Sequence, residues 1–128
     1  MRKLIKTLLK DKILFIAFSI TVIICYLSLR KIESFPINLS NSDKIYHAIA
    51  YFILALTWLL SFPISKEKNK VKYIIAFGCV FYGIIIEVLQ TTLTTYRTAS
   101  FLDVVANTAG VFMALIVFKS IYKKINAI

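Results

Sequence analysis

The chain has 128 residues, of which 59% are hydrophobic, and its mean hydropathy is +0.80. These values exclude a soluble globular domain of this size and indicate a membrane protein. The formal net charge of +10 does not indicate a nucleic-acid-binding domain, because the 16 lysines and arginines flank the apolar segments and do not form one basic face.

Four apolar segments are long enough to cross a membrane. A spanning helix needs ~20 apolar residues to cross a hydrocarbon core of ~30 Å, and none of the segments shows the alternation of a barrel strand. We therefore predict an all-α fold, an integral membrane four-helix bundle, as a single domain over residues 1–128. The predicted helices are residues 13–29, 45–64, 71–89 and 101–121.

The first segment, from Ile13 to Leu29, follows a basic stretch and resembles the apolar part of a signal peptide. Its 17 residues are more than such a region usually has, and no small-x-small cleavage pattern follows it. We expect this segment to remain in the protein as a membrane anchor.

Basic residues are divided unevenly between the two ends of the predicted bundle. Twelve lie on the side of the termini and the second connection, whereas four, Arg30, Lys31, Lys44 and Arg97, lie on the other side. The cytoplasmic loops of membrane proteins carry the excess of lysine and arginine. We therefore predict that both termini are cytoplasmic and that the first and third connections are external.

The second segment begins with polar residues at helical spacing. Asp43, His47 and Tyr51 recur every four residues and share one face, with Lys44 beside them. Asp43 also suits a helix cap, Lys44 can extend to lipid headgroups, and Tyr51 suits an interfacial aromatic belt. His47 has no such explanation, because an ionisable group within an apolar segment is costly and normally faces a functional interior.

The third segment carries Glu87 and Gln90, three residues apart, near its external end. Glu87 follows three isoleucines, so neither capping nor solvation explains it well. By charge its partners are Arg97 or Lys44, and by hydrogen bonding its partner is His47. Any of these pairs brings polar residues of different segments together.

The fourth segment begins with Asp103, Asn107 and Gly110, whose spacings of four and three place them on one face. Ser100 and Asp103 also match a capping box, which is a structural alternative for Asp103. Gly110 and Ala114 form a stripe of small residues that lets helices approach closely and should face protein. The polar residues of the last three segments all lie at one end of the bundle, which predicts a single shared site.

Together these residues resemble the motifs of the VanZ-like family, which is named for teicoplanin-resistance membrane proteins. The pattern D-K-x-x-H-x-x-x-Y begins at Asp43, E-x-x-Q begins at Glu87, and R-x-x-S-x-x-D-x-x-x-N-x-x-G begins at Arg97. The residues before Arg97 depart from the Pro-Gly pair that many members have there. The resemblance implies a multi-pass protein of the bacterial cell membrane in which the motif residues are important.

One interpretation of the shared site is a binding pocket. It would recognise a lipid-linked envelope component or a lipid headgroup at the external face, with the effect on lipoglycopeptide sensitivity that the family name implies. Lys44 and Arg97 would bind phosphate or carboxylate groups, and the amide and hydroxyl side chains would bind sugar or amide groups. The expected ligand-binding residues are Asp43, Lys44, Tyr51, Gln90, Arg97, Asp103 and Asn107.

Two other interpretations remain open. The chain can be a membrane-embedded hydrolase or transferase that acts on such a lipid, with His47 and Glu87 as the catalytic acid–base pair. It can also be a small transporter, which we disfavour because the ionisable groups of the site lie near one membrane face and provide no relay to the other. Whether the chain is an enzyme is not decided by the sequence.

No cofactor and no metal are expected. The chain has one histidine and no HExxH motif, and its two cysteines lie in apolar segments without CxxC spacing. His47 with Glu87, Asp43 and Asp103 nearby is nevertheless a chemically possible ligand set. The expected partners are membrane lipids or lipid-linked cell-wall intermediates and not nucleic acid, and a homo-oligomer remains open.

Overall fold

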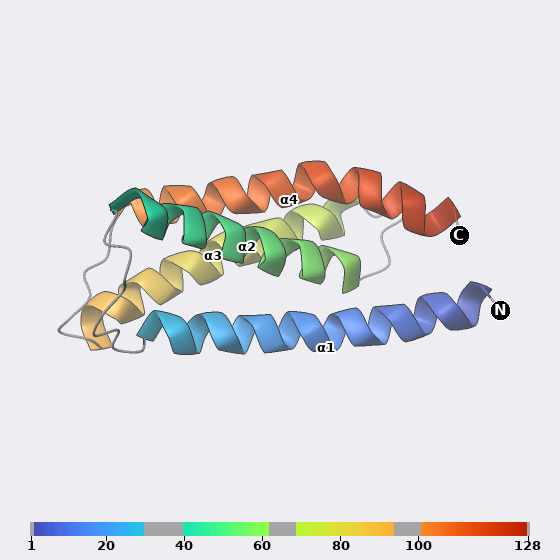
Figure 1. Ribbon diagram of the computed structural model, residues 1–128, viewed down its shortest axis with the longest axis horizontal. Coiled ribbons are helices and arrows are strands. Elements are labelled where there is room, and N and C mark those ends of the chain that lie inside the picture. The colour runs from blue at the N-terminus through green and yellow to red at the C-terminus, as the bar shows by residue number, and fades with distance from the viewer. Residues whose placement is uncertain (1, 30–39, 62–68, 94–100, 128) are drawn as a thin grey trace.

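The computed structural model describes residues 2–29, 40–61, 69–93 and 101–127. These four ranges are four helices, so the predicted all-α, four-helix fold is confirmed. The helices lie side by side and alternate in direction, with the start of the first and the end of the last at the same end of the bundle (Figure 1). They are α1 (Arg2–Leu29), α2 (Ser40–Ser61), α3 (Asn69–Leu93) and α4 (Phe101–Ala127).

All four helices extend beyond the predicted ranges at one or both ends, and α2 begins at Ser40, five residues before its predicted start. Helix α1 begins at Arg2 because the lysines and leucines before Ile13 are good helix formers. Helix α3 continues to Leu93, and the hydroxyls of its last threonines donate to backbone carbonyls of the preceding turn, as Thr92 Oγ1 does to Val88 O at 2.9 Å. Helix α4 likewise continues to Ala127, whereas residues 62–64 of the second predicted helix lie outside the described residues.

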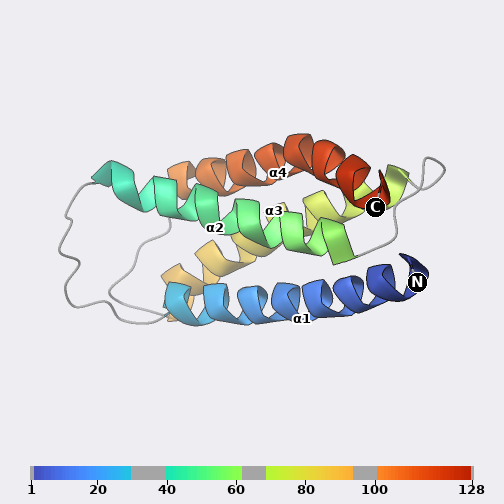
Figure 2. The same cartoon turned by 45° about the vertical axis from the view of Figure 1, so that its right-hand side comes forward.

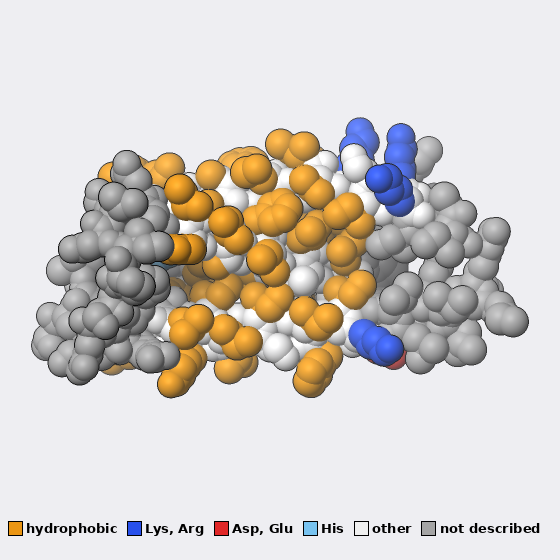
Figure 3. All heavy atoms as spheres, viewed as in Figure 1, with side chains coloured by type: hydrophobic (Ala, Val, Ile, Leu, Met, Phe, Trp, Pro, Cys, Tyr) orange, Lys and Arg blue, Asp and Glu red, His pale blue; other side chains and the backbone are white. Residues whose placement is uncertain are grey.

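All four helices contain a stretch that is long and apolar enough to cross a membrane. Large apolar side chains point outward from them, for example Phe15, Phe77 and Ile116, each more than 70% exposed. Hydrophobic side chains cover the middle of the face shown in Figure 3, and lysines lie at the end that carries the termini. The chain is therefore a multi-pass membrane protein, and the cytoplasmic location of its termini stays a prediction.

Helix α2 packs most extensively against α4. The two backbones approach closely at Gly110, where an added Cβ would collide with the backbone carbonyl of Ala48. Ala114, one turn later, is fully buried, which confirms that the stripe of small residues faces protein. Several larger side chains complete the core between these helices, among them Leu54, Leu59, Val111 and Phe118.

Helix α1 lies on the opposite side of the bundle from α4, with α2 and α3 between them in both views (Figures 1 and 2). It contacts α2 and α3. Near the end of α1, the carbonyl of Ser28 accepts a hydrogen bond of 2.9 Å from Gln90 Nε2 on α3. In the part of the chain that the structure describes, α1 therefore packs against α2 and α3, two of the three helices that carry the predicted site.

Candidate functional site

Three ionisable side chains from three different helices converge at one end of the bundle. They are His47 on α2, Glu87 on α3 and Asp103 on α4, and each offers a nitrogen or oxygen atom within 4.8 Å of the other two. The Nδ1 atom of His47 lies 3.8 Å from Oδ1 of Asp103. We call these three residues the polar cluster. Their convergence agrees with the prediction of a shared site, and their roles stay predictions.

The polar cluster lies inside the candidate membrane spans and not in the connections. His47 lies three residues after the start of the α2 span at Lys44, and Glu87 lies six residues before the end of the α3 span at Leu93. Glu87 is 4% exposed and Asp103 is 7% exposed, whereas His47 is half-buried. Buried ionisable groups at this depth are costly and are usually functional.

A second layer of residues lies one helical turn deeper than the polar cluster. Tyr51 follows His47 by four residues, Asn107 follows Asp103 by four, and Gly83 precedes Glu87 by four, so each shares a helix face with its neighbour. A Cβ added to Gly83 would lie 3.0 Å from Asn107 Nδ2 and 3.1 Å from Tyr51 Cε2. The absence of a side chain at Gly83 therefore leaves room for the side chains of both Asn107 and Tyr51 beneath the polar cluster.

Several buried oxygen atoms of the two layers have no hydrogen-bond partner among the described residues. They are the hydroxyl of Tyr51, Oδ1 of Asp103 and Oδ1 of Asn107. Tyr51 is 3% exposed and Asn107 is 2% exposed. Most buried polar atoms in proteins are hydrogen-bonded, because leaving one unpaired costs about 1–3 kcal/mol. Three such oxygens in adjacent layers are therefore expected to meet a polar ligand or an ion.

Lys44 lies at the rim of the polar cluster. Its Nζ atom is 3.7 Å from Oδ1 of Asp103, and its side chain is 32% exposed. An ion pair of this length and exposure contributes little to stability. The lysine therefore places a positive charge at the rim of the polar cluster, and its contact with an anionic group stays a prediction.

Other predicted site residues are placed differently or are not described. Gln90 is buried and donates to the end of α1, so its amide holds α3 against α1. Asp43 belongs to α2, but its side chain lies outside the described residues. Arg97 and the capping residue Ser100 lie outside the described residues as well.

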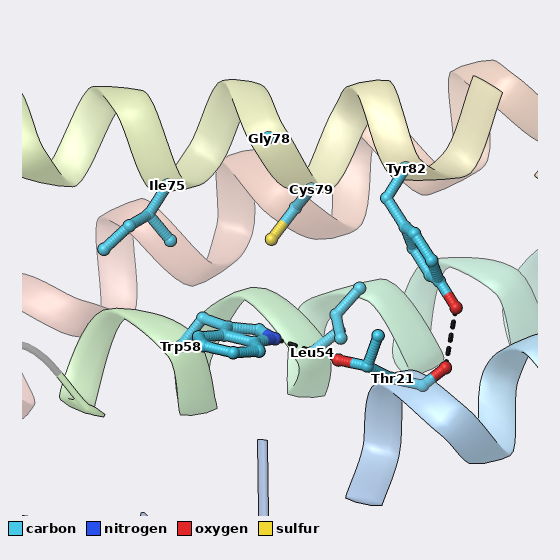
Figure 4. A pocket seen from close by; sticks show the side chains of 7 residues that line it. All are labelled: Thr21, Leu54, Trp58, Ile75, Gly78, Cys79 and Tyr82. Atoms are coloured by element: carbon cyan, nitrogen blue, oxygen red, sulfur yellow. Dashed lines mark hydrogen bonds between the residues drawn. The ribbon is translucent and has the colours of Figure 1, made fainter. Parts of the chain in front are cut away.

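The sequence analysis missed an apolar pocket between α1, α2 and α3, shown in Figure 4. Its volume is about 260 Å³, and Thr21 connects its walls: Oγ1 accepts a hydrogen bond of 3.0 Å from Trp58 Nε1, and its carbonyl accepts one of 2.6 Å from the Tyr82 hydroxyl. A tryptophan and a tyrosine in the middle of apolar segments were the available signal, since their polar atoms need partners there. The pocket is lined by Thr21, Leu54, Trp58, Ile75, Gly78, Cys79 and Tyr82.

Comparison with known proteins agrees with the motif resemblance. The VanZ/LLP1 family profile matches residues 12–122, nearly the whole chain. A relative in Schizosaccharomyces pombe, an uncharacterized protein, is 33% identical over 108 residues, which cover 84% of this chain and 63% of the relative. The chain thus spans less than two thirds of that relative's length. No solved structure matches this chain. With most of its length matched by one family profile, and its motif residues gathered at one end of four membrane helices, the chain belongs to the VanZ/LLP1 family.

Proposed function

We propose that this chain binds the polar headgroup of a membrane lipid or of a lipid-linked envelope component at the end of the bundle that holds the polar cluster. The observation that carries the proposal is the set of buried oxygens on Tyr51, Asp103 and Asn107 that lack partners among the described residues. Asp103 lies two residues after the start of its membrane span at Phe101, and Tyr51 and Asn107 lie about one helical turn deeper. A ligand that enters from the bilayer surface and binds these oxygens must place its polar part inside the membrane span, as a lipid headgroup near the surface can.

Lys44 supports an anionic headgroup. Its partly exposed side chain at the rim is suited to meet a phosphate, as lysine does in many proteins. Arg97, if it lies near this rim, would add a bidentate contact, and this stays a prediction. Asn107 and Tyr51 would bond the neutral part of the headgroup through the amide and the hydroxyl.

The relative in Schizosaccharomyces pombe favours a ligand class that is common to bacterial and fungal membranes. Phospholipid headgroups meet this condition, so we favour them over a cell-wall intermediate. Location in a bacterial cell membrane, and an effect on sensitivity to lipoglycopeptides, remain proposals that rest on the family resemblance. Both would follow if the bound lipid changed the chemistry of the membrane surface.

A membrane-embedded hydrolase or transferase is the second candidate. The position of Asp103 favours it, because a carboxylate 3.8 Å from the imidazole of His47 can orient that ring as a base, with Glu87 as the second acid–base group. Incubating the purified protein with phospholipid vesicles and analysing the products distinguishes the two candidates. Product formation that stops in His47→Ala would favour the enzyme, whereas lipid binding without product would favour the binding protein.

Lipid retention by the purified protein tests the proposed binding function. We expect native mass spectrometry of the protein released from detergent to show a phosphate-containing lipid bound to the wild type. Lys44→Gln should weaken this retention, and Lys70→Gln, at an exposed position near the opposite end, should not. Equal retention by the wild type and by Lys44→Gln would argue against headgroup recognition at this rim.

A further inference from the structure

The polar cluster has the donor atoms of a metal site with open coordination positions. One imidazole nitrogen and two carboxylates come from three helices, and their atoms lie within 4.8 Å of one another. Zinc binds such donors at about 2.0–2.2 Å, so donors around one ion lie about 3–3.5 Å apart. The pair formed by His47 and Asp103, at 3.8 Å, is already close to that spacing. Small side-chain movements would bring the three donors to coordination distance.

The two carboxylates of the polar cluster also favour the binding of a cation. Glu87 and Asp103 are both more than nine-tenths buried inside membrane spans, and an ionised carboxylate in such surroundings is strongly disfavoured unless it is neutralised. Lys44 lies near Asp103 but is partly exposed, so it neutralises a buried charge only weakly. A divalent cation would neutralise both carboxylates at once. A proton shared among the three groups is the alternative.

The second layer provides an independent observation. Tyr51 and Asn107 lie one turn below His47 and Asp103, and both have a buried oxygen without a partner among the described residues. Residues beneath a metal site commonly hold its ligands and its bound water through hydrogen bonds. The amide of Asn107 and the hydroxyl of Tyr51 are placed for that role, in the space that Gly83 leaves.

We propose that His47, Glu87 and Asp103 bind one divalent transition-metal ion of the Zn²⁺ or Mn²⁺ kind. The donor set contains no thiolate, and an imidazole with two carboxylates suits these ions. Three protein donors leave one or more positions open to water or to an oxygen of a ligand. The metal site stands on its own geometry. Its use in holding a headgroup phosphate beside two carboxylates that would otherwise repel it rests on the proposed function.

Metal binding should be measured on the full chain without a histidine tag, in a maltoside detergent that contains no phosphate. After treatment with a chelator, the wild type should bind one equivalent of Zn²⁺ in competition with a chromogenic zinc indicator. Glu87→Gln and Asp103→Asn should weaken binding at least about 100-fold, since even an outer-shell substitution costs about 10- to 100-fold. The matched control is Asp11→Asn, which removes an exposed carboxylate from α1 and should bind like the wild type.

A spectroscopic measurement tests the proposal without any variant. The chain has a single histidine, so an imidazole nitrogen coupled to bound Mn²⁺ in pulsed EPR can come only from His47. The coupling should change when the protein is labelled with ¹⁵N-histidine. Equal Zn²⁺ binding by the wild type and Glu87→Gln, no saturable equivalent, or Mn²⁺ bound without this coupling would each overturn the metal site.

The two proposals fail separately. Metal binding is measured in the absence of lipid, and lipid retention is measured on protein as purified. One equivalent of metal without a retained lipid would support the metal site and contradict headgroup binding. A retained lipid without metal binding would contradict the metal site and leave the carboxylates to be neutralised by protons.

Discussion

The polar cluster and the apolar pocket are both built from side chains inside the membrane spans, but they treat their polar atoms differently. In the apolar pocket, the indole of Trp58 and the hydroxyl of Tyr82 both donate to Thr21, and Thr21 Oγ1 donates to Ala17 O at 2.8 Å. Around the polar cluster, several buried oxygens have no partner among the described residues.

This difference indicates two roles for polar side chains within a membrane protein. Polar atoms that pair with one another fasten helices together, as hydrogen bonds between membrane helices commonly do. Buried oxygens on α2 and α4 that lack a hydrogen-bond partner among the described residues, as those of Tyr51, Asp103 and Asn107 do, are expected to bind something else. The first arrangement predicts an effect of substitution on stability, and the second predicts an effect on binding.

The largest expected effect concerns which compartment the polar cluster faces. Reporter fusions at Met1, Lys68 and Ile128 should give cytoplasmic signals, and fusions at Asn41 and Thr94 should give external signals, in an all-or-none pattern. The reason is the division of basic residues, twelve against four. A fusion at Lys68 that reported from outside would place the cluster at the cytoplasmic face and exclude an external ligand.

The next prediction concerns the polar cluster itself. Glu87→Gln and His47→Ala should each abolish metal binding and impair any membrane phenotype of the protein, without lowering its abundance in the membrane. Abundance must be measured by immunoblotting of membranes, because removing one member of a buried pair can cost about 3–5 kcal/mol and unfold the protein. Tyr46→Phe is the control, since Tyr46 is 48% exposed and lies off the face shared by His47 and Tyr51.

Normal abundance and full activity of both variants would mean that the cluster serves packing alone. The polar cluster would then resemble the apolar pocket in function. The two regions would then differ only in how many of their buried polar atoms are hydrogen-bonded.

Two glycines differ in how closely they are packed: Gly110 on α4 lies against the backbone of α2, whereas Gly78 lies on an exposed part of α3. Gly110→Ala should destabilise the protein by about 1–3 kcal/mol, because the new Cβ would collide with the backbone of α2 at Ala48. Gly78→Ala should be neutral or slightly stabilising, since nothing lies within 4 Å of its Cβ position and alanine favours a helix by about 1 kcal/mol. Thermal unfolding in detergent, followed by circular dichroism, checks both. Equal stability of the two variants would contradict the close approach of α2 and α4.

The smallest effect is expected in the apolar pocket. Thr21→Val removes the acceptor of the Trp58 indole and should cost about 0.6 kcal/mol, with an upper limit of about 1.7 kcal/mol. Thr57→Val is the matched control, because Thr57 Oγ1 donates only to carbonyls of its own helix in the hydrogen bonds described. Neither variant should change metal binding. A loss of metal binding in Thr21→Val would show that the two regions are coupled.

The sequence was sufficient for the fold because the bilayer imposes length and hydrogen bonding on every spanning segment. It also placed His47 with Tyr51, and Asp103 with Asn107, on common faces, since helical periodicity needs no tertiary information. The end of the bundle at which they gather followed from the alternating direction of the helices.

Details that depend on how each helix is rotated could not be predicted. Gln90 was expected in the site, yet it donates to the backbone carbonyl of Ser28. A bond to a backbone group cannot be predicted from a pattern of side chains. Gly83 was not among the predicted site residues, and its closeness to Asn107 appears only when α3 and α4 are placed together. The sequence named His47, Glu87 and Asp103, with Asp43, as a possible ligand set, but no metal was expected because these three donors are 40 and 16 residues apart and form no local metal-binding motif.

The distribution of the polar cluster over α2, α3 and α4 has a consequence for how the protein is made. The ribosome completes His47 and Glu87 before it reaches Asp103, so two of the three groups exist before the helix that carries the third. Helix α1 contributes no residue to the cluster and can insert before α2 as an independent anchor. The cluster forms only when α4 docks against α2, and the insertion of α4 is therefore the event that assembles the site.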